Sequence, residues 1–161
     1  MKPDRTGAAR IPNILAIAGS DPSGGAGIQA DIKAISANGG YAMAALTALT
    51  AQNTRGVSGV HGVPPDFVAA QIAAVRADIR VDAVKIGMLG SPEIALRLAD
   101  RLDSLAGPIV FDPVMIATSG AVLADDATIE AAGLVAVLQN AAESPENRTV
   151  ACESIHALSK S

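Results

Sequence analysis

The feature that most constrains the fold is a glycine-rich segment at residues 19–27, with the sequence GSDPSGGAG, between a short apolar run and a helical pattern. The run before it, residues 14–18, has the length and composition of a buried strand. After it, isoleucines at 28, 32 and 35 recur at helical spacing. Backbone N–H groups at such a strand–turn–helix junction can point outward and bind a small polar or anionic ligand. A plain tight turn is the alternative.

The same alternation of strand and helix occurs about four times along the chain. Further strands are expected at the apolar runs of residues 41–49, 81–89 and 109–111, although the alanines of the first run also allow a helix. Helices are expected over residues 28–38, from Pro64, from Ser91 and over residues 127–140, and a short exposed strand or flap over residues 57–63. This order predicts an α/β fold, with a parallel sheet and helices on both faces.

Two details of the expected helices can be stated residue by residue. Ser91 followed by Pro92 is a favourable helix start, with a capping hydroxyl before proline at the first helical position. In the helix that begins near Pro64, we expect Phe67, Ile72 and Val75 to contact the core.

Composition and charge exclude several classes of partner. The net charge is −4 and there is no basic block, so neither nucleic acid nor an acidic membrane surface is an expected partner. No apolar run approaches the roughly 20 residues of a membrane span. Cys152 is the only cysteine, which excludes an internal disulfide and favours a reducing, cytoplasmic location. His61 and His156 have no cysteine or acid at metal-ligand spacing, so no metal cluster is expected.

Ligands of open α/β sheets bind outside the carboxyl ends of the strands, and here four expected strands end in glycine or polar residues. Gln52 can both donate to and accept from a ring edge, or it is a solvated loop residue. Asp31, in the first turn after the glycines, either contacts a ligand or complements the helix dipole. Asp112 either faces Mg²⁺ and phosphate groups or forms a turn. A methionine such as Met88 is by itself more typical of a core.

Four segments resemble, in order and spacing, the motifs of the hydroxymethylpyrimidine/phosphomethylpyrimidine kinases, a thiamine-biosynthesis family of the ribokinase-like superfamily. They are AGSDPSGGAGIQAD at residues 18–31, TALTAQNTRGV at 47–57, KIGML at 85–89 and DPVM at 112–115. The resemblance implies a three-layer ribokinase-like fold. It also implies a transferase that moves phosphate from MgATP to hydroxymethylpyrimidine and then to its monophosphate, with ATP and Mg²⁺ as cofactors.

The resemblance also implies roles for individual residues. Gln52 would bond the aminopyrimidine edge, Met88 and Val114 would form walls of the pocket, and Asp112 would lie toward the phosphates and the metal. The substrate-binding residues implied in this way are Gly19, Asp21, Ala26, Asp31, Thr50, Gln52, Met88 and Val114.

The similarity fades after Gln139, and a late Gly-Thr-Gly-Cys motif expected for the family's anion hole does not follow. We therefore expect residues 1–140 to form the N-terminal part of a C-terminally truncated ribokinase-like domain, and residues 141–161 to form a divergent, poorly ordered tail. Because phosphoryl transfer depends on positioning and charge stabilisation, little activity is expected from this chain alone. The alternative is a non-catalytic pyrimidine-binding protein. Since an incomplete sheet exposes an edge and an apolar face, we expect self-association or a homo-oligomer.

Overall fold

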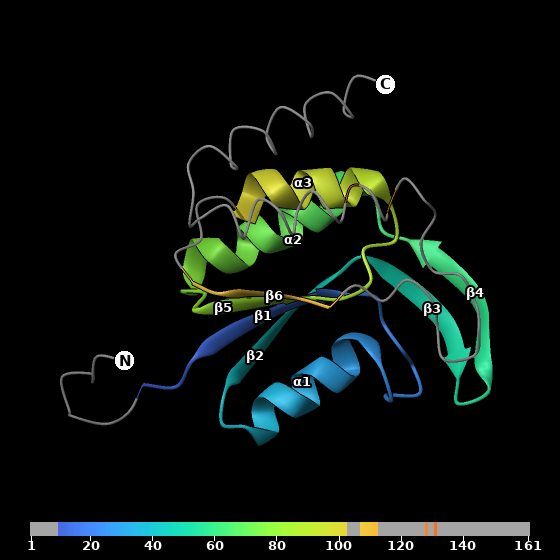
Figure 1. Ribbon diagram of the computed structural model, residues 1–161, viewed down its shortest axis with the longest axis horizontal. Coiled ribbons are helices and arrows are strands. Elements are labelled where there is room, and N and C mark those ends of the chain that lie inside the picture. The colour runs from blue at the N-terminus through green and yellow to red at the C-terminus, as the bar shows by residue number, and fades with distance from the viewer. Residues whose placement is uncertain (1–9, 103–106, 113–127, 129–130, 132–161) are drawn as a thin grey trace.

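The computed structural model describes residues 10–102, 107–112, 128 and 131. The elements run in the order β1 (Asn13–Ala18), α1 (Gly27–Ala37), β2 (Tyr41–Leu46), β3 (Ala48–Asn53), β4 (Gly56–Gly62), α2 (Pro65–Asp78), β5 (Ala83–Ile86), α3 (Pro92–Leu102) and β6 (Ile109–Phe111) (Figure 1). The helix expected over residues 127–140, apart from Thr128 and Ala131, and the tail expected over residues 141–161 lie outside the described residues.

Four strands form a parallel sheet in the order β2-β1-β5-β6. β1 lies at its centre, where Ala18 pairs with Leu46 of β2 and Ile17 pairs with Ile86 of β5. All the carboxyl ends therefore lie at one edge of this sheet. Helix α1 covers one face, and α2 and α3 cover the other (Figure 1). The predicted parallel α/β sheet with helices on both faces is confirmed.

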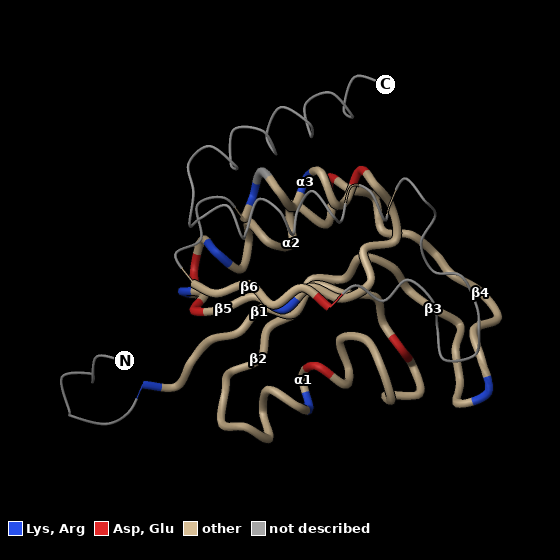
Figure 2. Tube along the Cα trace, in the orientation of Figure 1, with Lys and Arg blue, Asp and Glu red and all other residues tan. Residues whose placement is uncertain are grey.

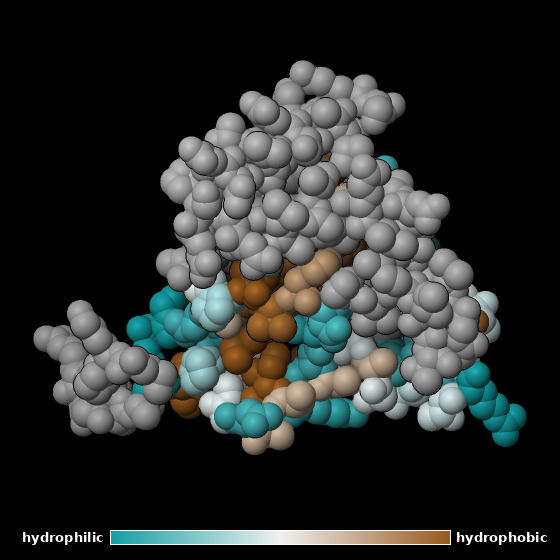
Figure 3. Space-filling model, in the orientation of Figure 1, coloured by the Kyte–Doolittle hydropathy of each residue, from teal (hydrophilic) through white to brown (hydrophobic). Residues whose placement is uncertain are grey.

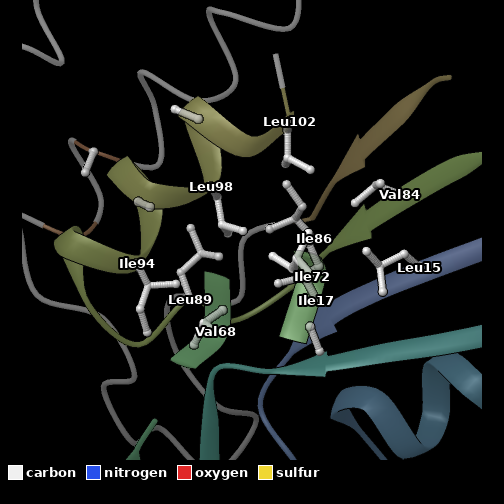
Figure 4. Packing of buried hydrophobic residues seen from close by; sticks show 14 of the residues in the cluster. Leu15, Ile17, Val68, Ile72, Val84, Ile86, Leu89, Ile94, Leu98 and Leu102 are labelled. Atoms are coloured by element: carbon white, nitrogen blue, oxygen red, sulfur yellow. The ribbon is translucent and has the colours of Figure 1, made fainter. Parts of the chain in front are cut away.

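The core lies between the sheet and the α2–α3 pair (Figure 4). Alternate residues of β1 point to this side, and Leu15 and Ile17 are fully buried there. On the opposite face, which α1 covers, β1 carries Ile14 and the alanines at 16 and 18. Ile72 and Leu98 fill the same cluster from α2 and α3. The cluster comprises Leu15, Ile17, Met43, Ala45, Val68, Ile72, Val84, Ile86, Leu89, Ile94, Ala95, Leu98, Ala99, Leu102 and Ala131.

One predicted strand, over residues 41–49, is two strands in different sheets. The chain leaves the parallel sheet at Thr47, which is fully buried, and β3 then pairs antiparallel with β4 in a separate hairpin. The Gln71 side chain pairs with the outer edge of β2 where the strand ends: its amide oxygen accepts from Leu46 N at 2.9 Å and its amide nitrogen donates to Leu46 O at 3.0 Å. These bonds replace the partners that a neighbouring strand would supply.

The prediction that Phe67 contacts the core is wrong, because its side chain is 62% exposed. The buried stripe of α2 is set by Val68 and Ile72, with Val75 partly buried, and Phe67 lies about 100° away from Val68 around the helix. The predicted start of α3 is confirmed, since Ile94 N donates to Ser91 Oγ at 3.3 Å. No helix within the described part of the chain is long and apolar enough to span a bilayer.

Candidate functional site

The glycine-rich segment follows β1 and is fastened to the hairpin by Ser20. Ser20 N donates to Ala48 O at 2.9 Å, and Thr50 N donates to Ser20 Oγ at 3.2 Å. The Thr50 hydroxyl donates to Ser20 O at 2.8 Å. Thr50 and Gln52 lie in β3, not in a loop after a strand of the parallel sheet as the sequence suggested. Ser20 was not predicted as a site residue, because a serine in a turn gives no signal of its partner 30 residues away.

Gln52 lies on the same face of β3 as Thr50. Its amide oxygen is 3.3 Å from Thr50 Oγ1, whose single hydrogen is better directed at Ser20 O. The Gln52 side chain is half-buried. Within the described residues, this long contact leaves most of the donor and acceptor capacity of the amide for a ligand.

Met88 and Gly19 meet where β1 and β5 end. Met88 is only 8% exposed, and its backbone is held by Thr47 Oγ1, which donates to Met88 O at 2.7 Å. A Cβ built on Gly19 would lie 2.3 Å from Met88 Cε, so any larger residue at 19 would require the Met88 side chain to move. The strand ends of β1 and β5 are thus in direct contact, as the order of the sheet predicts.

Asp21 is 2% exposed and accepts four hydrogen bonds. The donors are Ser23 N at 2.8 Å, Ser23 Oγ at 2.7 Å, Gly25 N at 3.0 Å and Ala26 N at 2.8 Å. Burial alone would raise the pKa of the Asp21 carboxyl, but the bonds from Ser23, Ala26 and Gly25 together outweigh it, so the pKa lies below its ordinary value. The expectation that these backbone N–H groups point outward is wrong, because they point at Asp21. Ala26 itself is exposed.

Asp31 pairs with Lys85. Lys85 Nζ lies 3.0 Å from Asp31 Oδ1, and the two side chains are 25% and 17% exposed. The pair joins α1 to β5 across the small residues of β1. Since α1 begins at Gly27, its first turn contains no acid, and the reading of Asp31 as a partner of the first-turn dipole is wrong. Lys85 was noted only as part of a motif, although a lone charge within an apolar strand signals a buried partner.

Asp112 follows β6 at the same edge of the sheet, where its N–H donates to Ile86 O at 2.9 Å. The residue is exposed. Val114, expected as a wall of the pocket, lies outside the described residues. In the part of the chain that the structure describes, no group of three or more His, Cys, Asp or Glu residues could hold a metal ion. Over the same part, Figure 2 shows acidic and basic positions interspersed, without a basic stripe.

Comparison with known proteins identifies the family to which the chain belongs. The sequence model of a family described as phosphomethylpyrimidine kinase matches residues 21–141. The hydroxymethylpyrimidine/phosphomethylpyrimidine kinase of Salmonella typhimurium is 51% identical over 119 residues, which are 73% of this chain and 45% of that protein. A thiamine biosynthesis multifunctional protein of Corynebacterium glutamicum is 47% identical over 127 residues, 78% of this chain and 17% of that protein. The chain therefore spans less than half the length of these curated relatives.

Solved structures show the same fold. A crystal structure of phosphomethylpyrimidine kinase from Clostridium difficile superposes with a TM-score of 0.71 at 38% identity, covering 91% of this chain and 71% of that one. A pyridoxal kinase from Staphylococcus aureus in complex with ADP gives a TM-score of 0.66 at 36% identity, covering 76% of this chain and 44% of that one. The ribokinase-like fold predicted from the motifs is confirmed.

Proposed function

We propose, from the premise that this chain belongs to the phosphomethylpyrimidine kinase family, that the carboxyl edge of its sheet binds hydroxymethylpyrimidine as the acceptor of a phosphoryl group. One observation carries the proposal: separate segments meet at that edge through specific contacts. Gly19 packs on Met88, and Ser20 is bonded to Thr50. A site for a small flat ring needs this kind of prearranged wall and polar edge.

Gln52 supplies the polar edge in this proposal. Its amide offers a donor and an acceptor side by side, which matches the amino group and adjacent ring nitrogen of an aminopyrimidine. Gly19, Ala26, Thr50 and Met88 surround the ring. Val114 belongs to the same proposed wall, and Asp31, held by Lys85, lies at its margin.

The reaction proposed for the whole family protein is transfer of phosphate from MgATP to hydroxymethylpyrimidine and then to its monophosphate. MgATP, when bound, supplies the phosphoryl group. Mg²⁺ is commonly held by one or two carboxylates together with phosphates and water, and Asp112 offers one such carboxylate. The N–H groups of residues 23, 25 and 26 do not fit nucleotide phosphates, because they already donate to Asp21. In this proposal the described residues supply most of the acceptor site, and Asp112 is the one described residue that would face the phosphates.

Pyrimidine binding without catalysis is the second candidate for this chain by itself. The observation that favours it is the use of the loop N–H groups within the protein, which leaves Asp112 as the one described residue proposed to face the phosphates. Both candidates require the same acceptor site, so a binding measurement tests what they share.

Calorimetric titration with hydroxymethylpyrimidine, with and without MgATP, is the test. Binding by the parent chain that is lost in Gln52→Ala and kept in Ser58→Ala, a control on the neighbouring strand β4, supports the acceptor site. Heat that continues only when MgATP is present indicates turnover and favours the kinase over the second candidate. Absence of binding at millimolar ligand, by a chain shown to be folded, overturns both.

A further inference from the structure

The carboxylate of Asp21 occupies the position that an anionic ligand takes in many glycine-rich loops. Such loops bind anions because successive backbone N–H groups converge on one point near a helix N-terminus. Here the N–H groups of Ser23, Gly25 and Ala26 converge within 3.0 Å of the Asp21 carboxylate, just before α1 begins at Gly27. The anion that this loop binds is therefore part of the loop.

Further bonds close the loop on both sides of Asp21. Asp21 N donates to Gln29 Oε1 at 2.8 Å, and Gly24 N donates to Asp21 O at 2.9 Å. Lys33 Nζ donates to Gly24 O at 2.8 Å. Residues 21–26 are thus held by contacts among themselves and with α1.

Asp21 is directly joined to the residues of the proposed acceptor site. Ser20, its neighbour in the chain, is bonded to Ala48 and Thr50 of β3, and Gly19 packs on Met88. A change in the direction of the chain at Asp21 therefore moves both contacts. The Asp21 side chain cannot itself reach a ligand while it is 2% exposed and bonded four times.

We propose that Asp21 is a positioning residue, whose carboxylate acts as the built-in anion of the loop and holds Gly19 and Ser20 in place for the uncharged ring of the acceptor. The phosphate of a phosphorylated acceptor is then bound elsewhere, because the loop N–H groups are engaged and the Asp21 charge repels another anion. The part of this proposal that concerns binding of the ring rests on the proposed function. The part that concerns Asp21 as the internal anion of the loop does not.

Formate rescue tests the internal anion. Asp21→Ala removes a carboxylate that formate can replace, and we expect its midpoint of thermal unfolding to fall by roughly 3–12 °C. Formate should raise this midpoint in a saturable way, compared with chloride at equal ionic strength. Parent chain and Asp66→Ala, which removes an exposed carboxylate, should show no such gain. Failure of formate to stabilise folded Asp21→Ala overturns the proposal.

A measurement on the parent chain keeps the proposal testable if Asp21→Ala does not fold. Amide hydrogen exchange by NMR should be slow at Ser23, Gly25 and Ala26 without ligand, and inorganic phosphate should leave these resonances unshifted. Fast exchange, or saturable shifts with phosphate, contradicts the internal anion.

The positioning role of Asp21 is tested by the affinity of the chain for hydroxymethylpyrimidine. At a temperature where both proteins are folded, Asp21→Ala should bind hydroxymethylpyrimidine about tenfold more weakly or worse, and formate should restore the affinity. Unchanged affinity in Asp21→Ala overturns the positioning role. If the parent chain binds no pyrimidine, the proposed function fails, while formate rescue of stability still tests the internal anion.

Discussion

Gly19 and Gly27 both occupy positions where a side chain would collide with a neighbour, but the neighbours differ in stiffness. A Cβ on Gly27 would lie 2.3 Å from the backbone oxygen of Gly19, and Gly27 has a φ of 56°. A Cβ on Gly19 would meet the tip of the Met88 side chain at the same distance. Backbone cannot yield without disturbing the turn, whereas a methionine thioether can rotate away.

Substitution by alanine should therefore have different effects at the two glycines. Gly27→Ala is expected to lower the free energy of unfolding by more than about 1 kcal/mol, because φ is positive and the obstacle is backbone. Gly19→Ala should cost less stability but weaken pyrimidine binding, since Met88 must leave its place. Urea denaturation and titration of both variants measure this. Equal losses of stability, or normal affinity in Gly19→Ala, would contradict the argument.

Asp21 should make the stability of the folded chain depend on pH. Its native pKa lies below its ordinary value, so the unfolded chain binds the proton first as the pH falls. The stabilisation is fully present above the ordinary pKa of about 3.9 and is lost as the pH falls through the native pKa. Asp21→Asn should be less stable than the parent by about 1–3 kcal/mol at pH 7. Unfolding measured from pH 7 to pH 3 should show that the difference in stability between the parent and Asp21→Asn becomes smaller in acid. A difference that stays constant with pH would contradict this role of the Asp21 charge.

At the scale of elements, sequence patterns predicted those helices and strands whose formation depends on residues within the same segment. The isoleucine spacing of α1, the Ser91–Pro92 start of α3 and the apolar run of β6 lie within the segments they specify. The division of residues 41–49 into two strands could not be predicted, because the apolar pattern continues through Thr47. The side chain that pairs with the last residue of β2, Gln71, lies 25 residues away on α2.

Long sequence separation between contacting residues also limits prediction of the candidate site. The positions of glycines and polar residues at strand ends indicated its location. The contacts that arrange it, Ser20 with Thr50 and Asp31 with Lys85, join residues 30 and 54 positions apart, and no periodicity reports them. The inward direction of the N–H groups near Asp21 was missed for another reason. The sequence of a ligand-binding turn and that of a self-bonded turn share the same glycines.

Gln71→Ala tests the junction between β2 and β3. The change removes both bonds to Leu46 and should destabilise the chain by about 1–3 kcal/mol. Alanine has the higher helix propensity, so α2 considered alone would gain slightly, and the two effects have opposite signs. Chemical denaturation decides between them. A neutral or stabilising result would mean that the glutamine does not hold the strand end.

At the scale of the whole molecule, the described sheet has β2 and β6 at its two edges. Val110 of β6 is 58% exposed, and Leu49 and Val60 of the hairpin are 46% and 55% exposed. Figure 3 shows apolar side chains on the described surface turned toward the viewer, at the level of the sheet. Apolar groups at strand edges favour association with other chains.

We therefore expect the chain to self-associate. Light scattering coupled to size-exclusion chromatography should give a mass above the 16.1 kDa of one chain, increasing with concentration. Val110→Lys places a charge on β6 and should reduce this association. Thr54→Lys, in the turn of the hairpin, is the control for added charge. A monodisperse monomer at all concentrations would contradict the expectation.

The hydrogen bonds between Ser20 and β3 also affect local opening of the structure. Because Thr50 donates twice to Ser20 and Ser20 donates to Ala48, the glycine-rich segment cannot detach while the hairpin stays in place. We therefore expect these two stretches, which are far apart in the sequence, to open together as one cooperative unit. The rates at which a small molecule enters and leaves this edge would then both be limited by the rate of this joint opening, which depends on the hairpin as much as on the glycine-rich segment.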